Sequence, residues 1–375
     1  MTNNKLKIAY DASYAFGPKN GTTVYSQQLL KFLAKNDRYH QYIIFPFFFY
    51  HTCPNFKEFQ PKLPQNFSIF LNKIPKYFTQ KLWKQLLPQV DILHSTTFTI
   101  PPKKFYNKFV FTVLDTTFYT HPQFHQQANI DHCLSATKIA VKTADAIIAI
   151  SNQTKKDLIN YFDCPESKIY VTHLACDQEF FKTKPKENIN RVLKKHKLSK
   201  PYIFHLGNLE PRKNTLGLIK AYQLLPETIR SQFDLVIAGG AGWMNNEISN
   251  YITYHNKDRR IRVLGYVEQK ELPSLYQGAK CFAYPSFYEG FGIPVLEAMA
   301  SKCPVLTSNI SSLPEVGQNA VLYCNPYDII DIKNKILQLL TNDNQELIKR
   351  GKLQAKKFSW DKCAKETIDI YEKLC

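Results

Sequence analysis

Short apolar runs alternate with segments of helical periodicity along most of this chain. Apolar runs bounded by turn residues are typical of strands buried in a parallel sheet, and amphipathic segments between them are typical of covering helices. In the first half the expected strands are Leu6–Tyr10, Tyr42–Phe47, Asp91–His94, Phe109–Leu114, Ala146–Ile150 and Ile169–Val171. The expected helices include Thr22–Ala34, Lys76–Leu87, Ala128–Thr143 and Gln153–Tyr161, the last behind the N-cap pair Ser151–Asn152.

A second alternating series occupies the other half of the chain. Its expected strands are Tyr202–Leu206, Leu235–Ala238, Arg262–Leu264, Cys281–Tyr284, Val305–Thr307 and Val321–Tyr323. The lysine-rich segment 182–200 between the two series has the composition of a linker that runs into a short helix. The α/β pattern therefore predicts two Rossmann-like, doubly wound domains, with ligands at the carboxyl ends of their strands.

Composition narrows the class of protein. The chain has 375 residues, which favours two domains, and no apolar run approaches the length of a membrane-spanning helix. The first residues carry no apolar core of a signal peptide, and the nine cysteines are scattered without a C-x-x-C pair. A cytoplasmic protein without a structural zinc site is the expectation.

The net charge of +18 implies anionic partners. Residues 51–110 contain nine lysines but only Glu58 and Asp91 as acidic residues, and aromatic residues lie among them. This stretch is interpreted as a solvated basic face over buried aromatic rings, or as a patch for an anionic membrane surface or acceptor. Nucleic acid is not expected, because no RNA- or DNA-binding motif accompanies the charge.

The first segment with candidate chemistry is GNLEPRKN, which directly follows the strand expected at 202–206. Gly207 permits a tight turn and the close approach of a ligand. Arg212 and Lys213 then place two cations at the start of the next helix, where Asn214 or Thr215 could act as the cap. Cations beside a helix N-terminus suit a phosphate group.

The second segment is YPSFYEGFGIPVLE, which again follows an apolar strand. Gly290 and Gly292 flank Phe291, so the backbone amides of this loop can lie against a pyrophosphate or sugar hydroxyls. Pro294 suits the first turn of a helix, because its fixed φ is already helical. This segment therefore predicts a second anion-binding helix start.

Two glutamates, Glu289 and Glu297, belong to this second segment and lie eight residues apart. Structural roles are open for both: Glu297 could offset the helix dipole, and Glu289 could be a loop carboxylate. Arg212 could likewise form only a salt bridge with Glu210. A glycosidase pair of acid and nucleophile fits poorly, because that chemistry needs no phosphate-ready helix starts.

This arrangement resembles the retaining GT-B glycosyltransferases of family 4, whose signature is two glutamates separated by seven residues behind a glycine-rich loop. The resemblance extends through DILHSTTFTIPP, KTADAIIAISNQTKKDLI, GNLEPRKN, LGYVEQKELPSLYQGAKCFAYPSFYEGFGIPVLEAMA and CPVLTSNISSLPEV. It implies a GT-B fold, in which two Rossmann-like domains face each other across a cleft. Residues 1–181 with the C-terminal segment 358–375 would form the acceptor-side domain, 182–200 the linker and 201–357 the donor-binding domain.

The resemblance assigns donor-binding roles to matching residues. Arg212 and Lys213 would neutralise the diphosphate of a UDP- or GDP-linked sugar, and Glu289 would bind hydroxyls of the transferred sugar. The other donor contacts would come from the backbone amides of Phe291, Gly292 and Ile293, from Glu297 at the ribose and from Tyr266 and Val267 at the nucleobase. Stabilising the leaving diphosphate would then be the main catalytic effect. No Asp-x-Asp triplet occurs in the sequence, so neither a metal nor another cofactor is expected.

In the first half, Gly21 in GTTVY resembles the family's N-terminal glycine loop, although Thr22 or Thr23 could simply cap a helix there. His94, at the end of an expected strand, is either a cleft residue or a structural one. Relatives usually carry His-Asp after the fourth strand, but this chain has Leu114 in the place of the histidine, while Asp115 remains as a candidate on the acceptor side of the cleft. The change puts the usual contact to the transferred sugar in doubt.

The resemblance implies a retaining hexosyltransferase that adds mannose or glucose to a glycan or lipid-linked acceptor during surface polysaccharide or lipopolysaccharide assembly. The alternative is a catalytically impaired protein of the same fold that binds a nucleotide sugar or a glycan, because of Leu114. Either protein would be cytoplasmic, and a peripheral position at the inner face of the membrane is compatible with both.

Overall fold

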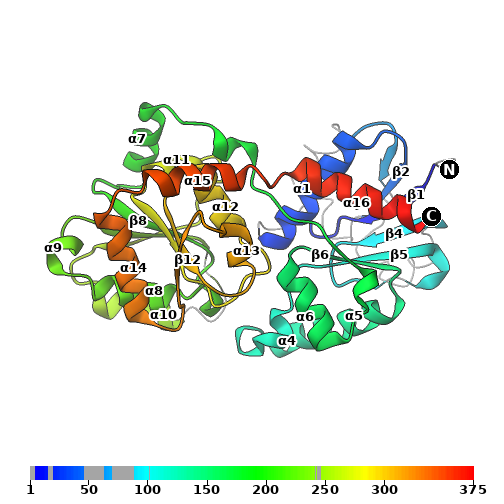
Figure 1. Ribbon diagram of the computed structural model, residues 1–375, viewed down its shortest axis with the longest axis horizontal. Helices are drawn as coiled ribbons and strands as arrows, with labels where there is room; N and C mark the ends of the chain where they lie inside the picture. The colour runs from blue at the N-terminus through cyan, green and yellow to red at the C-terminus, as the bar shows by residue number, and fades with distance from the viewer. Residues whose placement is uncertain are drawn as a thin grey trace, which may run out of the picture. The chain divides into compact units, whose positions relative to one another are not determined.

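The computed structural model describes residues 5–15, 20–45, 63–69, 88–100, 102–240, 242 and 246–375. The chain divides into two compact units (Figure 1), Met1–Leu174 with Ser359–Cys375 as unit 1, and Ala175–Phe358 as unit 2. The helix expected at Lys76–Leu87 and most of the basic stretch 51–110 lie outside the described residues.

Unit 1 contains a parallel sheet in the strand order β3-β2-β1-β4-β5-β6-β7. Its strands are β1 Lys7–Asp11, β2 Gln41–Phe45, β3 Phe67–Ile69, β4 Val90–Ser95, β5 Tyr106–Val113, β6 Ala146–Ala149 and β7 Ile169–Val171. Each expected strand of this half overlaps one of them. Only β3 was not expected, because three residues carry too little pattern to distinguish a strand from a loop.

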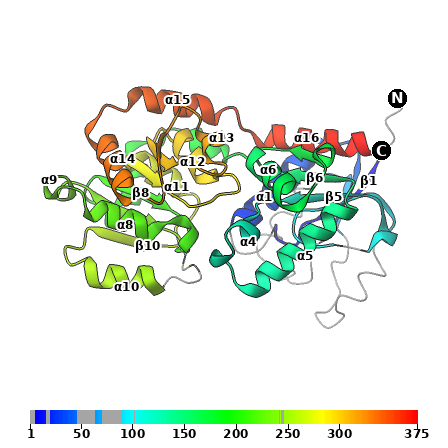
Figure 2. The same ribbon diagram turned by 60° about the horizontal axis from the view of Figure 1, so that its bottom comes forward.

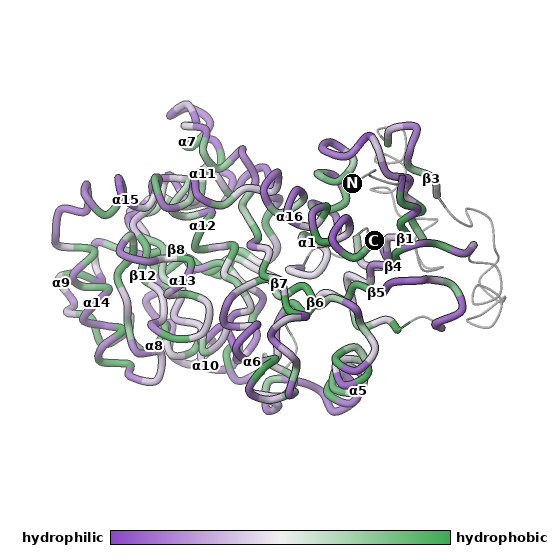
Figure 3. Tube along the Cα trace, turned by 45° about the vertical axis from the view of Figure 1, so that its right-hand side comes forward, coloured by the Kyte–Doolittle hydropathy of each residue, from purple (hydrophilic) through white to green (hydrophobic). Residues whose placement is uncertain are grey.

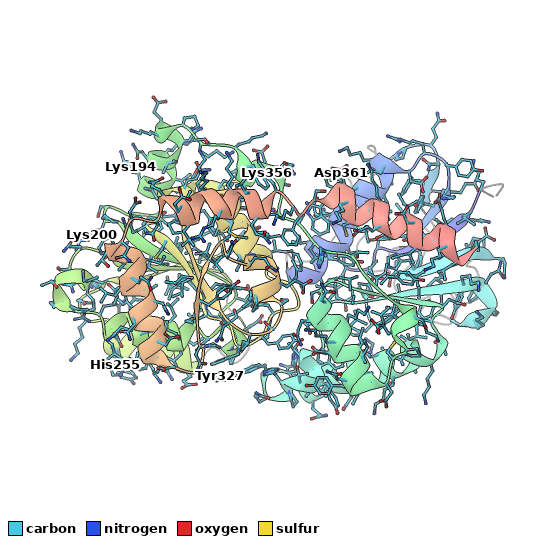
Figure 4. The ribbon with its side chains drawn as sticks, viewed as in Figure 1. Lys194, Lys200, His255, Tyr327, Lys356 and Asp361 are labelled. Carbon is cyan, nitrogen blue, oxygen red and sulfur yellow. The ribbon has the colours of Figure 1, made fainter. Side chains whose placement is uncertain are left out.

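In the described part of unit 1, the α-helices are α1 Gly21–Asn36, α4 Thr117–Thr120, α5 Gln127–Thr143, α6 Asn152–Phe162 and the C-terminal α16 Trp360–Leu374. The predicted N-cap of α6 is confirmed, since Ser151 Oγ accepts a hydrogen bond of 3.0 Å from the backbone N–H of Thr154. Helix α16 packs on α1, and its Asp361 (Figure 4) accepts a hydrogen bond of 2.8 Å from Lys35 Nζ.

Unit 2 contains a second parallel sheet, in the order β10-β9-β8-β11-β12-β13. Its strands are β8 Tyr202–Leu206, β9 Asp234–Ala238, β10 Ile261–Gly265, β11 Cys281–Tyr284, β12 Val305–Ser308 and β13 Leu322–Cys324. The strand order switches direction between β8 and β11, which are neighbours in the sheet. Open α/β sheets bind ligands at such a switch point, outside the carboxyl ends of the strands.

Helices cover both faces of this second sheet (Figure 2). They are α7 Lys186–Lys195, α8 Thr215–Gln223, α9 Glu227–Arg230, α10 Asn246–His255, α11 Leu272–Gly278, α12 Ile293–Ala300, α13 Leu313–Gly317, α14 Ile329–Thr341 and α15 Gln345–Ala355. Side chains of β8 alternate between the faces: Ile203 packs in a core with α8 and α14, whereas Phe204 contacts the ring of Tyr276 on α11. None of the helices in the described ranges is long and apolar enough to span a membrane.

The segment 182–200, which the sequence suggests as a linker, is attached to unit 2 along its length. The chain passes from one unit to the other at Leu174–Ala175, and α7 then packs against α11. Gln277 of α11 accepts a hydrogen bond of 2.8 Å from Lys184 N and donates one of 2.9 Å to Lys182 O. Polar composition alone does not reveal these bonds to a residue more than ninety positions away.

Apolar residues are concentrated in the strands of both sheets (Figure 3), and central strands such as β8 and β9 are buried on both faces. The strand β6, with the sequence AIIA, is buried at every position, whereas α5 alternates between hydrophobic and hydrophilic residues. Two histidines are also completely buried, His94 of β4 and His205 of β8. Burial lowers the pKa of His94 to about 3 and that of His205 to about 4.

These two histidines predict acid sensitivity in both units. A histidine whose pKa is lower in the folded state than the ordinary value of 6.5 opposes folding once the unfolded chain takes up a proton. The free energy of unfolding should therefore decrease as the pH falls below about 6.5, by roughly 1.4 kcal/mol per pH unit for each histidine. Urea unfolding at pH 7, 6 and 5 measures this loss, and a constant free energy over that range would contradict the prediction.

Candidate active site

The cationic side of the site is built on the loop after β8. Gly207 follows the last strand residue, and a Cβ atom there would lie 3.3 Å from Lys213 Cγ, so glycine allows the stem of Lys213 to pack across the loop. A single turn of 3-10 helix, Pro211–Lys213, then carries Arg212 and Lys213. Asn214 ends this turn in the left-handed conformation, at φ 54°. Both cations are thereby fixed immediately before α8.

Asn214 is the N-cap residue of α8, one of the two candidates that the sequence offered, but its side chain makes no capping hydrogen bond. Asn214 Nδ2 instead donates hydrogen bonds to two backbone carbonyls, those of Pro285 at 3.0 Å and Pro326 at 2.8 Å. Thr215 Oγ1 lies 3.0 Å from Nε2 of the buried His205. The first amides of α8 are therefore left without a side-chain acceptor, which favours an anion at this helix start.

The glycine-rich loop after β11 forms the other side of the site. Gly292 has a φ of 110°, and a Cβ atom there would lie 2.8 Å from Leu313 Cδ2, so glycine is required. Helix α12 begins at the next residue, with Pro294 in its first turn and no side-chain cap. Ser312 Oγ is 2.8 Å from both the Glu289 and the Phe291 carbonyl oxygens and holds the loop in place.

The two loops meet at a buried ion cluster formed by Arg212, Lys213 and Glu289. Lys213 Nζ lies 2.8 and 3.0 Å from the two carboxylate oxygens of Glu289, and Arg212 Nη1 lies 3.0 Å from one of them. The side chain of Glu289 is only 8% exposed. Arg212 also forms the salt bridge to Glu210 that the sequence allowed, at 3.7 Å.

The electrostatics of this cluster keep Glu289 ionised. Burial opposes its charge, but Lys213 and Arg212 outweigh this effect and lower the pKa of Glu289 to about 2. Burial and the neighbouring Arg212 lower the pKa of Lys213, while Glu289 opposes that shift. Lys213 Nζ also lies 2.7 Å from the Tyr284 hydroxyl. The two cations are therefore held in place before a ligand binds, and an anion could replace Glu289 as their partner without moving them.

Glu297, on α12, differs from the ionised Glu289 because its environment favours the protonated carboxyl. It is 8% exposed, and burial raises the pKa of its carboxyl to about 8, although the Tyr276 hydroxyl at 3.0 Å favours the charged form. The nearby Asp177 adds to the upward shift. Glu297 is therefore largely protonated at neutral pH in the absence of a ligand.

The residues expected near the nucleobase lie after β10. Gly265 ends this strand with a φ of 68°, and Tyr266 follows with 65% of its surface exposed. Val267 is buried. A flat, exposed ring beside a buried aliphatic residue can contact a base.

In unit 1, Gly21 is the first residue of α1, and an added Cβ atom would meet no heavy atom within 4 Å. The helix is capped by Asn20, whose Oδ1 accepts from the N–H of Thr23, so the alternative of a cap by Thr22 or Thr23 is wrong. Gly21 thus lies at an open helix start after β1.

The remaining candidates of unit 1 differ in burial. His94 is completely buried, with Nδ1 2.6 Å from the Tyr371 hydroxyl and Nε2 2.8 Å from Thr112 Oγ1, which favours the structural interpretation. Asp115 is half-buried, and its Oδ1 accepts from the backbone N–H and the hydroxyl of Thr117 at the start of α4. Leu114, directly after β5, is also half-buried and provides no polar group at this position.

The sequence did not predict four side-chain contacts of the site. Asn214 joins two loops, Tyr276 contacts Glu297, Tyr284 contacts Lys213, and Ser312 holds the glycine-rich loop. All four lie inside the motifs, but their partners are 21 to 112 positions away in the chain. Spacing along the sequence cannot reveal such pairs. No group of three or more His, Cys, Asp or Glu residues suited to a metal ion occurs in the part of the chain that the structure describes.

Family models match both halves of the chain. The model of Glycosyltransferase Family 4 matches residues 19–180, and that of Glycosyl transferases group 1 matches residues 178–357. The O-antigen chain mannosyltransferase B of Escherichia coli is 37% identical over 286 residues, which cover 76% of this chain and 74% of that protein. The serotype-specific mannosyltransferase WbdA of Escherichia coli is 32% identical, over 62% of this chain and 29% of that larger protein.

A solved structure shares the fold. The Anabaena protein Alr3699/HepE, determined in complex with UDP-glucose, superposes with a TM-score of 0.75 at 18% identity, over 98% of this chain and all of that one. Two parallel Rossmann-like sheets, the paired glutamates and the two family matches agree with one another. The chain therefore belongs to glycosyltransferase family 4 and is a glycosyltransferase with the GT-B fold.

Proposed function

We propose that this protein is a retaining hexosyltransferase that transfers mannose or glucose from a UDP- or GDP-linked donor to a glycan or lipid-linked acceptor in surface polysaccharide assembly. The observation that carries the proposal is the ion cluster of Arg212, Lys213 and Glu289 between two uncapped helix starts. The sugar class is supported by the O-antigen mannosyltransferase relative. We further propose that the protein acts at the inner face of the cytoplasmic membrane, where a lipid-linked acceptor would be found.

The cluster suits the departure of a nucleoside diphosphate. As the bond to the sugar breaks, negative charge grows on the leaving phosphate, and fixed cations and helix amides stabilise it without reorganising. Arg212 can bind two phosphate oxygens at once, and Lys213 adds a point charge. We propose that these groups make a metal ion unnecessary. Glu289, released from the cations by the phosphate, would then accept hydrogen bonds from the sugar.

Replacing Glu289 tests its role on the sugar. Glu289→Gln should abolish transfer but change the dissociation constant of the nucleoside diphosphate only a few-fold, because the cations remain. Turnover of UDP-glucose, UDP-galactose and GDP-mannose is followed by proton NMR, which also gives the anomeric configuration of the product. Glu247→Gln, at an exposed position on α10, is the matched control. Unchanged turnover of the Glu289 variant, or an inverted product, would contradict the proposal.

Replacing Arg212 tests the phosphate site. Arg212→Ala removes a charge-assisted contact and should weaken binding of UDP or GDP by about 1.5–3 kcal/mol, or roughly tenfold to 150-fold. Calorimetric titration with and without EDTA measures this loss and the proposed independence from metal. Arg350→Ala, on the exposed face of α15, should bind like the wild type. Equal affinity of the Arg212 variant would exclude the phosphate role.

Glu297 predicts a pH dependence of nucleotide binding. Its pKa of about 8 in the free protein means that binding to ribose hydroxyls through the ionised carboxylate must release a proton below pH 8. Affinity for the nucleoside diphosphate should therefore rise with pH up to about 8 and then level off. Glu297→Gln should remove this component and leave only the titration of the phosphate itself. Identical pH profiles of the two proteins would show that Glu297 does not bind the ribose.

A further inference from the structure

Two aromatic rings are stacked beside the ion cluster. Phe287, in the loop after β11, and Tyr327, in the turn after β13, have ring centroids 5.0 Å apart and planes inclined by 28°. Tyr327 is 64% exposed and lies at the rim of unit 2 (Figure 4). A single exposed ring is common on protein surfaces and needs further support before it indicates a ligand.

The turn that carries Tyr327 is held firmly. The backbone N–H of Tyr327 donates to Asn325 Oδ1 at 3.1 Å, and that of Asn325 donates to Asp331 Oδ2 at 2.8 Å. Asp328 Oδ1 in turn accepts from the first amides of α14. An exposed ring that stacks on a neighbour and is carried by a hydrogen-bonded turn loses less conformational entropy on binding than a ring on a free loop, as is typical of recognition surfaces.

The backbone segments that carry the two rings are hydrogen-bonded to residues 212–214, which include both cations. The backbone N–H of Phe287 donates to the Arg212 carbonyl at 2.9 Å. On the other ring's turn, the carbonyl of Pro326 accepts from Asn214 Nδ2 at 2.8 Å. The aromatic pair is thus continuous with the site that holds the two cations.

The strand order indicates which ligand these rings contact. Tyr266 follows β10 at one edge of the sheet, Arg212 and Lys213 follow β8, Glu289 follows β11, and Tyr327 follows β13 at the opposite edge. A donor with its base at β10 and its diphosphate at β8 places the transferred sugar at β11. The turn after β13 lies two strands further on, roughly 10 Å away, which is about the length of one or two hexose rings.

We propose that Tyr327, stacked on Phe287, is a subsite for a hexose ring of the acceptor glycan. This inference rests on the proposed function, because the donor direction fixes the acceptor side. The C–H groups on one face of a pyranose carry partial positive charge and fit the negative face of an aromatic ring. Tyr327 therefore contributes acceptor affinity and makes no contact with the nucleotide.

Binding of mannotriose and maltotriose tests the subsite directly. Saturation-transfer NMR on the UDP- and GDP-loaded protein should give signals from at least one trisaccharide with the wild type and with Tyr327→Phe, which retains the ring. Tyr327→Ala should raise the dissociation constant of that trisaccharide about tenfold, as expected for the loss of one stacking contact. Tyr254→Ala, at a residue of α10 that is 72% exposed, is the matched control and should bind normally.

Three results would overturn the proposal: no signal from either trisaccharide with the wild type, equal affinity of Tyr327→Ala, or weaker UDP and GDP binding by that variant. The last would assign the ring to the nucleobase. Donor turnover separates this inference from the proposed function. If Tyr327→Ala loses trisaccharide binding but the wild type turns over no nucleotide sugar, the subsite is supported and the transferase function is contradicted. If the wild type turns over a nucleotide sugar but Tyr327→Ala binds the trisaccharide as tightly as the wild type, the transferase function is supported and the subsite is contradicted.

Discussion

The buried carboxylate of Glu289 is the interaction on which the site depends. The side chains of Arg212 and Lys213 each lie within 3.0 Å of the Glu289 carboxylate, and all three are only 8% to 17% exposed. Each of these charges alone would cost several kcal/mol to bury. Each charge therefore offsets part of the burial cost of its partners. Because Arg212 and Lys213 belong to the loop after β8 and Glu289 to the loop after β11, this mutual stabilisation fixes the relative position of the two loops.

The two glutamates of the family signature have opposite protonation states for a physical reason. Glu289 faces two cations, so its pKa falls to about 2, whereas Glu297 faces the Tyr276 hydroxyl and its burial raises the pKa to about 8. Environments that separate the pKa values of neighbouring carboxyls commonly give them different tasks. A permanently ionised Glu289 can only accept hydrogen bonds, which suits sugar hydroxyls. Glu297 can exchange its proton for the hydrogen bonds of a ligand.

Periodicity predicted the strands of both sheets except β3, because buried strands need continuous apolar runs. Motif resemblance indicated the two loops that the structure brings together in the ion cluster. What the sequence did not predict are pairings between residues distant in the chain. His94 was as consistent with a cleft as with a core until Tyr371, 277 positions away, was placed beside its ring. The contacts of Tyr284 with Lys213 and of Tyr276 with Glu297 likewise depend on strand order, which local pattern does not determine.

Asn214 joins three separate loops of the site through its side-chain amide. Its left-handed backbone, at φ 54°, turns the chain from the cationic turn into α8, a conformation that Asn tolerates better than most residues. Its amide uses both N–H donors on carbonyls from the loops after β11 and β13. Glycine would keep the φ but lose both bonds, and aspartate would set a carboxylate against two carbonyl oxygens. Gly217 makes room for this amide, since a Cβ atom there would lie 2.2 Å from Asn214 Oδ1. The spacing N-x-x-G is therefore required by the hydrogen bonds of Asn214 to the two other loops, independently of any ligand.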